Sequence, residues 1–180
     1  MKKKLYWQLP FLVFLIVGTV FIVRQQRSTP YQHDKGQVFG TFYHITYQND
    51  TSLNNDILAE LAKVDSALSM FNDKSIISRI NRGEDVKTNE MFDTVFNLAE
   101  NIADNTNGAF DITVAPLVNA WGFGFKTGNP PTKAAIDSLR SIVGYKKVAL
   151  RNNRITKTDP RVMLDCSAIA KGYGCDVVAH

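Results

Sequence analysis

Cysteine and histidine are scarce in this sequence. The 180 residues include two cysteines, Cys166 and Cys175, and three histidines. Two cysteines nine positions apart exclude a disulfide-stapled mini-protein and a cysteine-rich zinc module. The histidines, His33, His44 and His180, have no metal-ligand spacing and lie toward the ends of the region outside the N-terminal apolar run. We therefore expect neither a histidine metal site nor a Ser-His-Asp triad.

A basic surface is also missing once the first 30 residues are set aside. The net charge is +4, but residues 1–30 hold five basic residues and no acidic one. The remainder has 16 basic and 17 acidic residues, so it has no general attraction for a polyanion, and we expect no nucleic-acid partner. A hydrophobic content of 44% excludes a disordered chain and allows one domain, or part of a larger one.

One long apolar run is present near the N-terminus. After a basic segment at 1–4, residues 5–23 read LYWQLPFLVFLIVGTVFIV, with no charge in 19 residues. At about 1.5 Å per residue, such a helix is nearly as long as the ~30 Å hydrocarbon core is thick. This pattern predicts a transmembrane anchor, and a cleaved signal peptide is the alternative. The lysines before the run favour a domain on the periplasmic or extracellular side, joined by a polar linker at 24–35.

Residues 36–180 alternate irregularly between strand-like and helix-like patterns, which predicts an α+β domain. We expect a strand or hairpin arm at 36–48, helices beginning near 52, 75, 88, 132 and 167, and strands at 145–150, 154–156 and 162–164. The last helical pattern still continues at His180, without a cap or polar tail. We therefore expect the domain to be truncated at its C-terminus.

Two segments have residues suited to binding a ligand, a flat one in the first segment and a phosphate in the second. In 107–113, glycine follows a helix end, a small alanine allows a flat ligand to approach, and Asp111 can accept ring N–H groups. In 165–172, a strand ends at Asp165 and leads into a helix start, where backbone amides and Lys171 could hold a phosphate. The alternatives are a helix cap before a buried strand, and an ordinary strand-to-helix turn with a solvated lysine.

Aromatic residues form a third candidate feature. They are Phe71, Phe110, Trp121, Phe123 and Phe125. Aromatic rings can enclose a planar heterocycle, although such residues more commonly belong to a core.

Five motifs in order resemble the ApbE family of FAD:protein FMN transferases, formerly called thiamine biosynthesis lipoproteins. The motifs are Phe39-Gly40-Thr41, Ser69-x-Phe71-x-x-x-Ser75-x-x-Ser78-Arg79-x-Asn81, GAFDITVAPLVNAWGFG at 108–124, Val143-Gly144-Tyr145-Lys146-Lys147-Val148, and LDCSAIAKGYGCDVVA at 164–179. The resemblance covers 36–180. It implies an α+β fold that binds FAD and Mg²⁺, transfers FMN to a Ser or Thr of an exported protein and releases AMP.

The resemblance also implies roles for individual residues. It places Phe39, where the family usually has Met, and Phe71 against the flavin. It assigns FAD contacts to Ala109, Phe110, Asp111, Asp165 and Lys171, and a magnesium-ligating backbone carbonyl to Ala168. The other metal ligands of the family, carboxylate and threonine side chains, fall in a later motif beyond His180. We therefore expect these residues alone to be inactive, with the catalytic groups also beyond His180.

Other activities fit the same residues. A FAD pyrophosphatase that releases FMN and AMP to water would use the same pocket. A non-catalytic, membrane-anchored flavin-binding module would need only the binding half of the site. A structural protein without flavin would leave the 108–124 motif unexplained.

Overall fold

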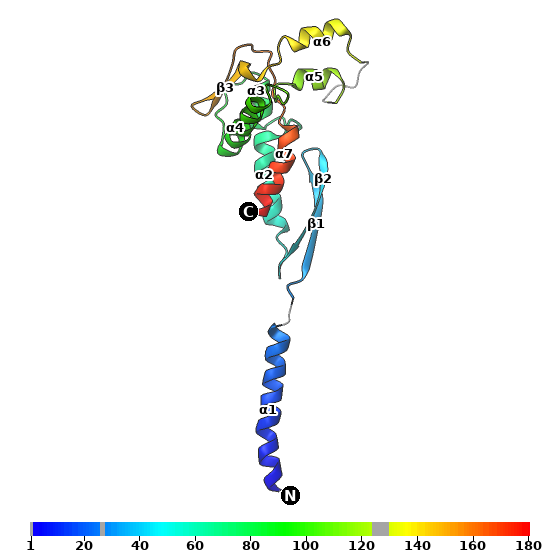
Figure 1. Ribbon diagram of the computed structural model, residues 1–180, viewed down its shortest axis with the longest axis vertical. Helices are drawn as coiled ribbons and strands as arrows, with labels where there is room; N and C mark the ends of the chain where they lie inside the picture. Colours follow the sequence, from blue (N-terminus) through cyan, green and yellow to red (C-terminus); the bar gives the residue numbers. More distant parts are fainter. Residues whose placement is uncertain (1, 26–27, 124–129) are drawn as a thin grey trace. The chain divides into compact units, whose positions relative to one another are not determined.

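The computed structural model describes residues 2–25, 28–123 and 130–180, with the side chains of the first helix described from Leu9 onward (Figure 1). Phe125 and Gly124, which belong to motifs discussed above, lie outside the described residues. The chain divides into two compact units. The first comprises residues 1–34 and 44–53, and the second comprises 35–43 and 54–180.

The first unit contains helix α1, Lys2–Gln25, which covers the apolar run. Across the part of the chain that the structure describes, no helix has both the length and the apolar character that a membrane crossing needs. The expected transmembrane helix at 5–23 is therefore not supported.

A β-hairpin follows, made of β1, Tyr31–Val38, and β2, Thr41–Gln48. Its two-residue turn is Phe39-Gly40, and both residues have positive φ, 53° and 69°. Positive φ at both positions is typical of the type I′ turn, which matches the twist of paired strands. The segment at 36–48 is thus two strands and not one, and β1 occupies part of the expected linker. The turn was missed because Phe-Gly is an unusual pair for it.

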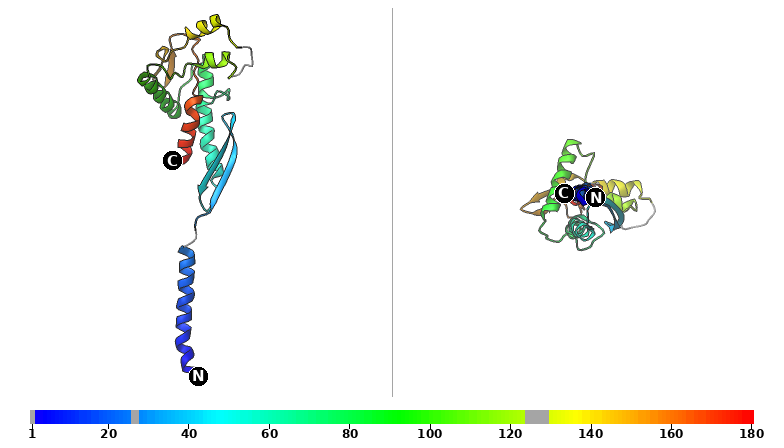
Figure 2. Two further views of the ribbon diagram at one scale, coloured as in Figure 1. Left: turned by 45° about the vertical axis from the view of Figure 1, so that its right-hand side comes forward. Right: turned by 90° about the horizontal axis from the view of Figure 1, so that it is seen from below.

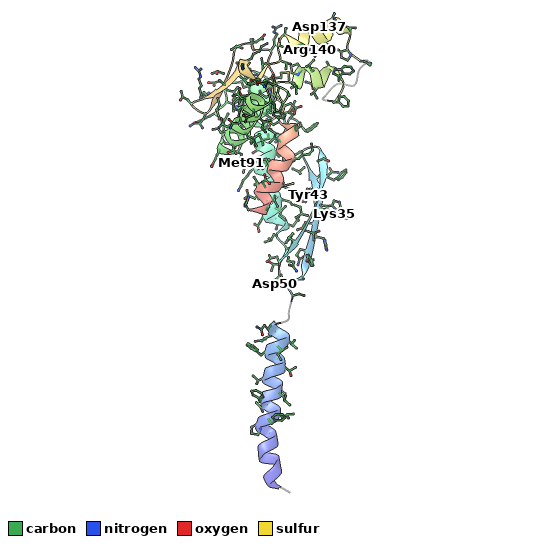
Figure 3. All side chains as sticks on the ribbon, in the orientation of Figure 1. Lys35, Tyr43, Asp50, Met91, Asp137 and Arg140 are labelled. Atoms are coloured by element: carbon green, nitrogen blue, oxygen red, sulfur yellow. The ribbon has the colours of Figure 1, made fainter. Side chains whose placement is uncertain are left out.

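The second unit is built around four helices, α2 Asn54–Leu68, α3 Ile76–Asn81, α4 Glu90–Asn105 and α7 Ser167–Ala179. Figures 1 and 2 show α7 lying beside α2, although about 100 residues separate them in sequence. Their inward faces share one core with α3 and α4. Its fully buried side chains include Val64, Ile77, Phe92, Val95 and Leu164. This core fixes where α7 begins, and residues at that end are candidates for the site.

Side-chain caps define the helix starts. Ser75 Oγ accepts the Ser78 N–H at 3.1 Å, and Asn89 Oδ1 accepts the Phe92 N–H at 2.9 Å. Such caps satisfy amides that the helix itself leaves unpaired. The helix expected to begin near residue 88 is therefore capped one position later, by Asn89, whereas the Thr132 cap of α6, Lys133–Arg140, is confirmed.

The remaining elements are short. Helix α5 is Ala115–Ala120, a 3-10 turn covers Tyr145–Lys147, and β3, Val148–Arg151, pairs with β4, Arg154–Lys157, in an antiparallel hairpin. The expected strand at 162–164 forms only an isolated parallel bridge, Val114 with Met163. The mixed helix and strand class is confirmed.

Candidate functional site

The two segments with nucleotide-binding character are neighbours in the second unit. The Val114–Met163 bridge joins them, and the Asp165 N–H donates to the Ile112 carbonyl at 2.7 Å. Ile112 and Leu164 are both 2% exposed or less, so burial holds this pairing together. The motifs around Asp111 and Asp165 therefore converge, as the resemblance implies.

Asp111 lies at the centre of a hydrogen-bond network. One carboxylate oxygen accepts the Thr113 backbone N–H at 2.7 Å and the Thr113 hydroxyl at 2.6 Å, and the other accepts the Tyr145 N–H at 2.8 Å. Thr113, which is fully buried, also accepts the Gly144 N–H at 2.7 Å. Both Asp111 oxygens are therefore engaged by the protein, which gives this residue a structural role whether or not it also meets a ligand.

Asp165 forms a hydrogen bond with the first turn of α7. Its Oδ1 accepts the Ser167 N–H at 2.8 Å, and the Cys166 carbonyl accepts the N–H groups of Ile169 and Ala170 at 2.9 and 2.8 Å. Three of the first four amides of the helix are therefore already bonded, which leaves this end less able to hold a phosphate through its backbone. Lys171 is exposed one turn further on, where its ammonium group can reach an anion.

The hairpin tip forms a second part of the candidate site. A methyl group built on Gly40 would lie 3.2 Å from Cδ2 of Phe71, so the backbone of the turn closely approaches this ring. Phe71 is 59% exposed, so part of its ring is accessible to solvent. Phe39, by contrast, is half-buried and packs on the core. A bulky residue at positive φ costs on the order of 1–3 kcal/mol, and such strain is commonly found near functional sites.

The 107–110 segment ends α4 in left-handed conformations, with φ of 51° at Asn107 and 80° at Gly108. A methyl group built on Gly108 would lie 3.3 Å from the Tyr145 ring. Ala109 is exposed, as a residue approached by a flat ligand should be, whereas Phe110 is half-buried against the core. Trp121 and Phe123 are 50% and 83% exposed, so among the described members of the aromatic set the core interpretation holds for Phe110 and not for the others.

Two acidic groups near these segments, the half-buried Glu100 and the buried Cys166, have raised pKa values. Burial, and then the charges of Asp111 and Asp104, raise the pKa of Glu100 on α4 to about 7, and its Oε1 is buried without a hydrogen-bond partner. Burial, followed by the charge of Asp165, raises the pKa of the Cys166 thiol to about 12. Cys166 is 1% exposed and therefore acts as a core side chain and not as a nucleophile.

A cavity of about 470 Å³ lies beside α5 and α6 in the second unit. Its lining is mainly apolar and consists of Pro116, Asn119, Ala120, Leu139, Ile142, Arg161 and Met163. None of the expected flavin contacts lines it, so the cavity and the convergent motifs are different features. We place the candidate site at the motifs, because they hold the polar and aromatic groups that a nucleotide needs.

Among the described residues, no group of three or more His, Cys, Asp or Glu side chains is arranged to hold a metal ion. Asp165 supplies one carboxylate close to Ala168, but Ala168 lies in the first turn of α7, where carbonyls normally accept helical N–H groups. The role implied for the Ala168 carbonyl stays a prediction, as do the flavin contacts implied for the other residues.

Sequence reasoning missed two residues that position the site. Asn81 exchanges two hydrogen bonds with the Leu164 backbone, and Thr113 links Asp111 to Gly144. Both residues lie inside the quoted motifs, but a polar side chain in a motif does not reveal whether it contacts ligand or backbone. Only the partners, 83 and 31 residues away in sequence, distinguish the two roles.

The fold and these motifs can now be compared with those of known proteins. The family model described as "ApbE family" matches residues 39–180. This chain belongs to the ApbE family.

Named relatives support the assignment. The chain is 35% identical over 172 residues to the FAD:protein FMN transferase of Haemophilus influenzae, covering 86% of this chain and 50% of the relative. It is 34% identical over 158 residues to that of Vibrio cholerae, covering 82% and 47%. The chain thus spans about half the length of the curated relatives it matches.

Solved structures show the same fold. The flavin transferase ApbE from Vibrio cholerae superimposes with a TM-score of 0.77 at 33% identity, over 83% of this chain and 52% of that one. The apo form of the Pseudomonas stutzeri flavinyl transferase ApbE superimposes with a TM-score of 0.76 at 25% identity, over 86% and 52%. The second unit is therefore an ApbE-type arrangement of helices and strands.

Proposed function

We propose that this protein transfers FMN from FAD to a Ser or Thr hydroxyl of an exported partner protein and releases AMP. The observation that carries the proposal is the convergence of the 108–114 and 163–171 motifs, through the Asp165–Ile112 hydrogen bond, in a chain of the ApbE family. The named relatives are FAD:protein FMN transferases, which supports the same reaction here.

The described residues supply binding and orientation. The exposed ring of Phe71, beside the Gly40 backbone, offers a face on which an isoalloxazine ring can stack. Exposed Ala109 leaves space for the flat ligand, and Lys171 offers a positive charge for its phosphates. These groups would hold FAD while a hydroxyl attacks the FMN phosphorus, forming the phosphoester bond as the bond to AMP breaks.

The test uses the native protein purified from cells that produce it. Incubation with FAD and an acceptor protein should give equal amounts of AMP and of acceptor carrying covalent FMN, measured by chromatography and mass spectrometry. AMP and free FMN without modified acceptor would replace the proposal with a FAD pyrophosphatase. Bound FAD without AMP release would indicate a flavin-binding module, and the absence of FAD binding would overturn all three.

We propose that the reaction depends on Mg²⁺. A hard cation with oxygen ligands suits a phosphoanhydride substrate, and the resemblance supports such a site. Removing divalent ions with a chelator should abolish AMP release, and added Mg²⁺ should restore it. Activity that persists in the chelator would contradict this dependence.

We also propose that the domain lies at the cell membrane, on its periplasmic or extracellular side. Supporting features are the basic residues at 2–4 and the exposed apolar side chains of α1, among them Phe11, Phe14 and Phe21. Protease added to intact spheroplasts should digest the 36–180 domain. Protection from the protease until the cells are lysed would place the domain inside and overturn the proposal.

A further inference from the structure

We propose that Gly174 is a positioning residue of the flavin site: its missing side chain leaves room for the Phe39 ring against α7, and this contact sets where Gly40 meets Phe71. The inference deepens the proposed function and rests on it for the identity of the ligand. The packing itself rests only on the contacts of the second unit.

The fit between Phe39 and α7 is close. A methyl group built on Gly174 would lie 3.2 Å from Cε2 and 3.6 Å from Cζ of the Phe39 ring, and 3.7 Å from a methyl carbon of Leu61 on α2. Gly174 is buried, and Leu61 is 5% exposed. Carbon atoms at 3.2 Å are closer than their optimal separation of about 3.5–4.0 Å, so any side chain at 174 would push the ring away.

The Phe39 ring has little freedom to move aside. Its backbone has φ of 53° in a two-residue turn, and β1 and β2 hold both ends of that turn. Leu61 Cδ2 lies 3.7 Å from the same built methyl position, so the space around residue 174 is already occupied by two side chains. A displaced ring would therefore carry the turn with it, since close-packed groups transmit strain.

The next residue, Gly40, connects this packing to the candidate site. Gly40 follows Phe39 directly, and its Cβ position lies 3.2 Å from Phe71 Cδ2. A shift of the turn by a few tenths of an ångström would change the contact between the Gly40 backbone and the exposed Phe71 ring. The Phe39 ring is accommodated beside α7 because residue 174 is glycine.

The same helix supplies a matched control. Gly172 lies two residues earlier on α7 and is exposed, and a methyl group built there meets nothing within 4 Å. Replacing either glycine with alanine brings the same gain in helix propensity. Any difference between Gly172→Ala and Gly174→Ala therefore reports the contact with Phe39 and Leu61.

The experiment compares Gly172→Ala, Gly174→Ala, Phe39→Met and the double variant Phe39→Met/Gly174→Ala in the complete chain. Gly172→Ala should raise the melting temperature by about 1–3 °C, while Gly174→Ala should lower it. The amide resonance of Gly40, which senses the Phe71 ring current, should move in Gly174→Ala and return toward its original position in the double variant. If Gly174→Ala alone does not fold, recovery of folding in the double variant supports the inference.

FAD titration adds the functional readout. Gly174→Ala should raise the dissociation constant roughly fivefold or more, and Phe39→Met/Gly174→Ala should restore it. A Gly174→Ala variant that behaves like Gly172→Ala, or that Phe39→Met does not rescue, would overturn the inference. So would a moved Gly40 resonance with unchanged FAD affinity. An unmodified chain that binds no FAD would instead refute the proposed function, and the Gly40 resonance would still decide the packing.

Discussion

Asn81 holds Leu164 through two hydrogen bonds that imitate the edge of a β-strand. Its Nδ2 donates to the Leu164 carbonyl at 2.8 Å, and its Oδ1 accepts the Leu164 N–H at 2.7 Å. The next residue, Asp165, donates its N–H to Ile112. A side chain at the end of α3 thereby fixes the segment that leads into α7, and with it the position of Asp165.

Replacing Asn81 with alanine should therefore destabilise the protein. Two backbone groups of Leu164 would lose their partners, and an unsatisfied buried group costs about 1–3 kcal/mol. Urea unfolding followed by circular dichroism measures this loss. Asn101→Ala, at an exposed position on α4, is the control and should change the free energy of unfolding by less than about 0.5 kcal/mol. Equal effects of the two substitutions would contradict the role given to Asn81.

Thr113 should be sensitive to loss of its hydroxyl and tolerant of loss of its methyl group. Thr113→Val keeps the shape but leaves the Gly144 N–H without its acceptor and removes one donor to Asp111, so we expect a cost of about 1–3 kcal/mol. Thr113→Ser keeps the hydroxyl and should retain most of the stability. Thermal unfolding of both variants tests this, and a valine variant as stable as the serine variant would contradict it.

Glu100 should make stability decrease as the pH rises. Its pKa is raised from 4.5 to about 7, so between these values the folded chain holds a proton that the unfolded chain releases. The free energy of unfolding contributed by this group therefore falls from about pH 4.5 to about pH 7 and is level above. Glu100→Gln should remove this slope, measured as melting temperature against pH, and should be more stable than the wild type at pH 8.

Glu84 should make the free energy of unfolding change with pH in the opposite direction to Glu100. Hydrogen bonds from Arg79 and then Arg82 hold the pKa of this exposed carboxyl below 4.5. Its stabilising effect is present above the ordinary pKa and is lost as the pH falls through the lowered value. Glu84→Gln should therefore be less stable than the wild type at neutral pH, with the difference vanishing in acid. The same pH trend for Glu84→Gln and Glu100→Gln would contradict both assignments.

Lys171 should affect ligand binding more than folding. Its side chain is exposed, so Lys171→Ala should change the free energy of unfolding by less than about 0.5 kcal/mol. If its ammonium group contacts a FAD phosphate, the loss should weaken FAD binding by about tenfold, the equivalent of one charge-assisted hydrogen bond. Flavin fluorescence titration measures this, with the exposed Lys87→Ala as control. Equal FAD affinities of the Lys171→Ala and Lys87→Ala variants would show that Lys171 does not contribute to FAD binding.

Much of the fold could be predicted from sequence because the relevant forces are local. Apolar spacing along α2 and α4 indicated helices whose buried residues, such as Val64 and Phe92, form the core. The Thr132 cap could be predicted from the sequence because capping involves residues three positions apart. The turn at Phe39-Gly40 was not, since Phe-Gly is an unusual pair for this turn, and the approach of the Phe39 ring to Gly174, far away in sequence, appears only in the fold.

By itself, the sequence determined the class of the domain and its membership of the ApbE family, because ordered motifs and periodicity are properties of the chain alone. Only the tertiary structure decided what those residues do there. Asp111 and Asp165 both hold protein backbone, and Phe71 stays exposed while Phe39 is packed away. A polar side chain forms hydrogen bonds, and an aromatic ring packs, with whichever groups the fold brings near. Those groups cannot be identified from the sequence alone.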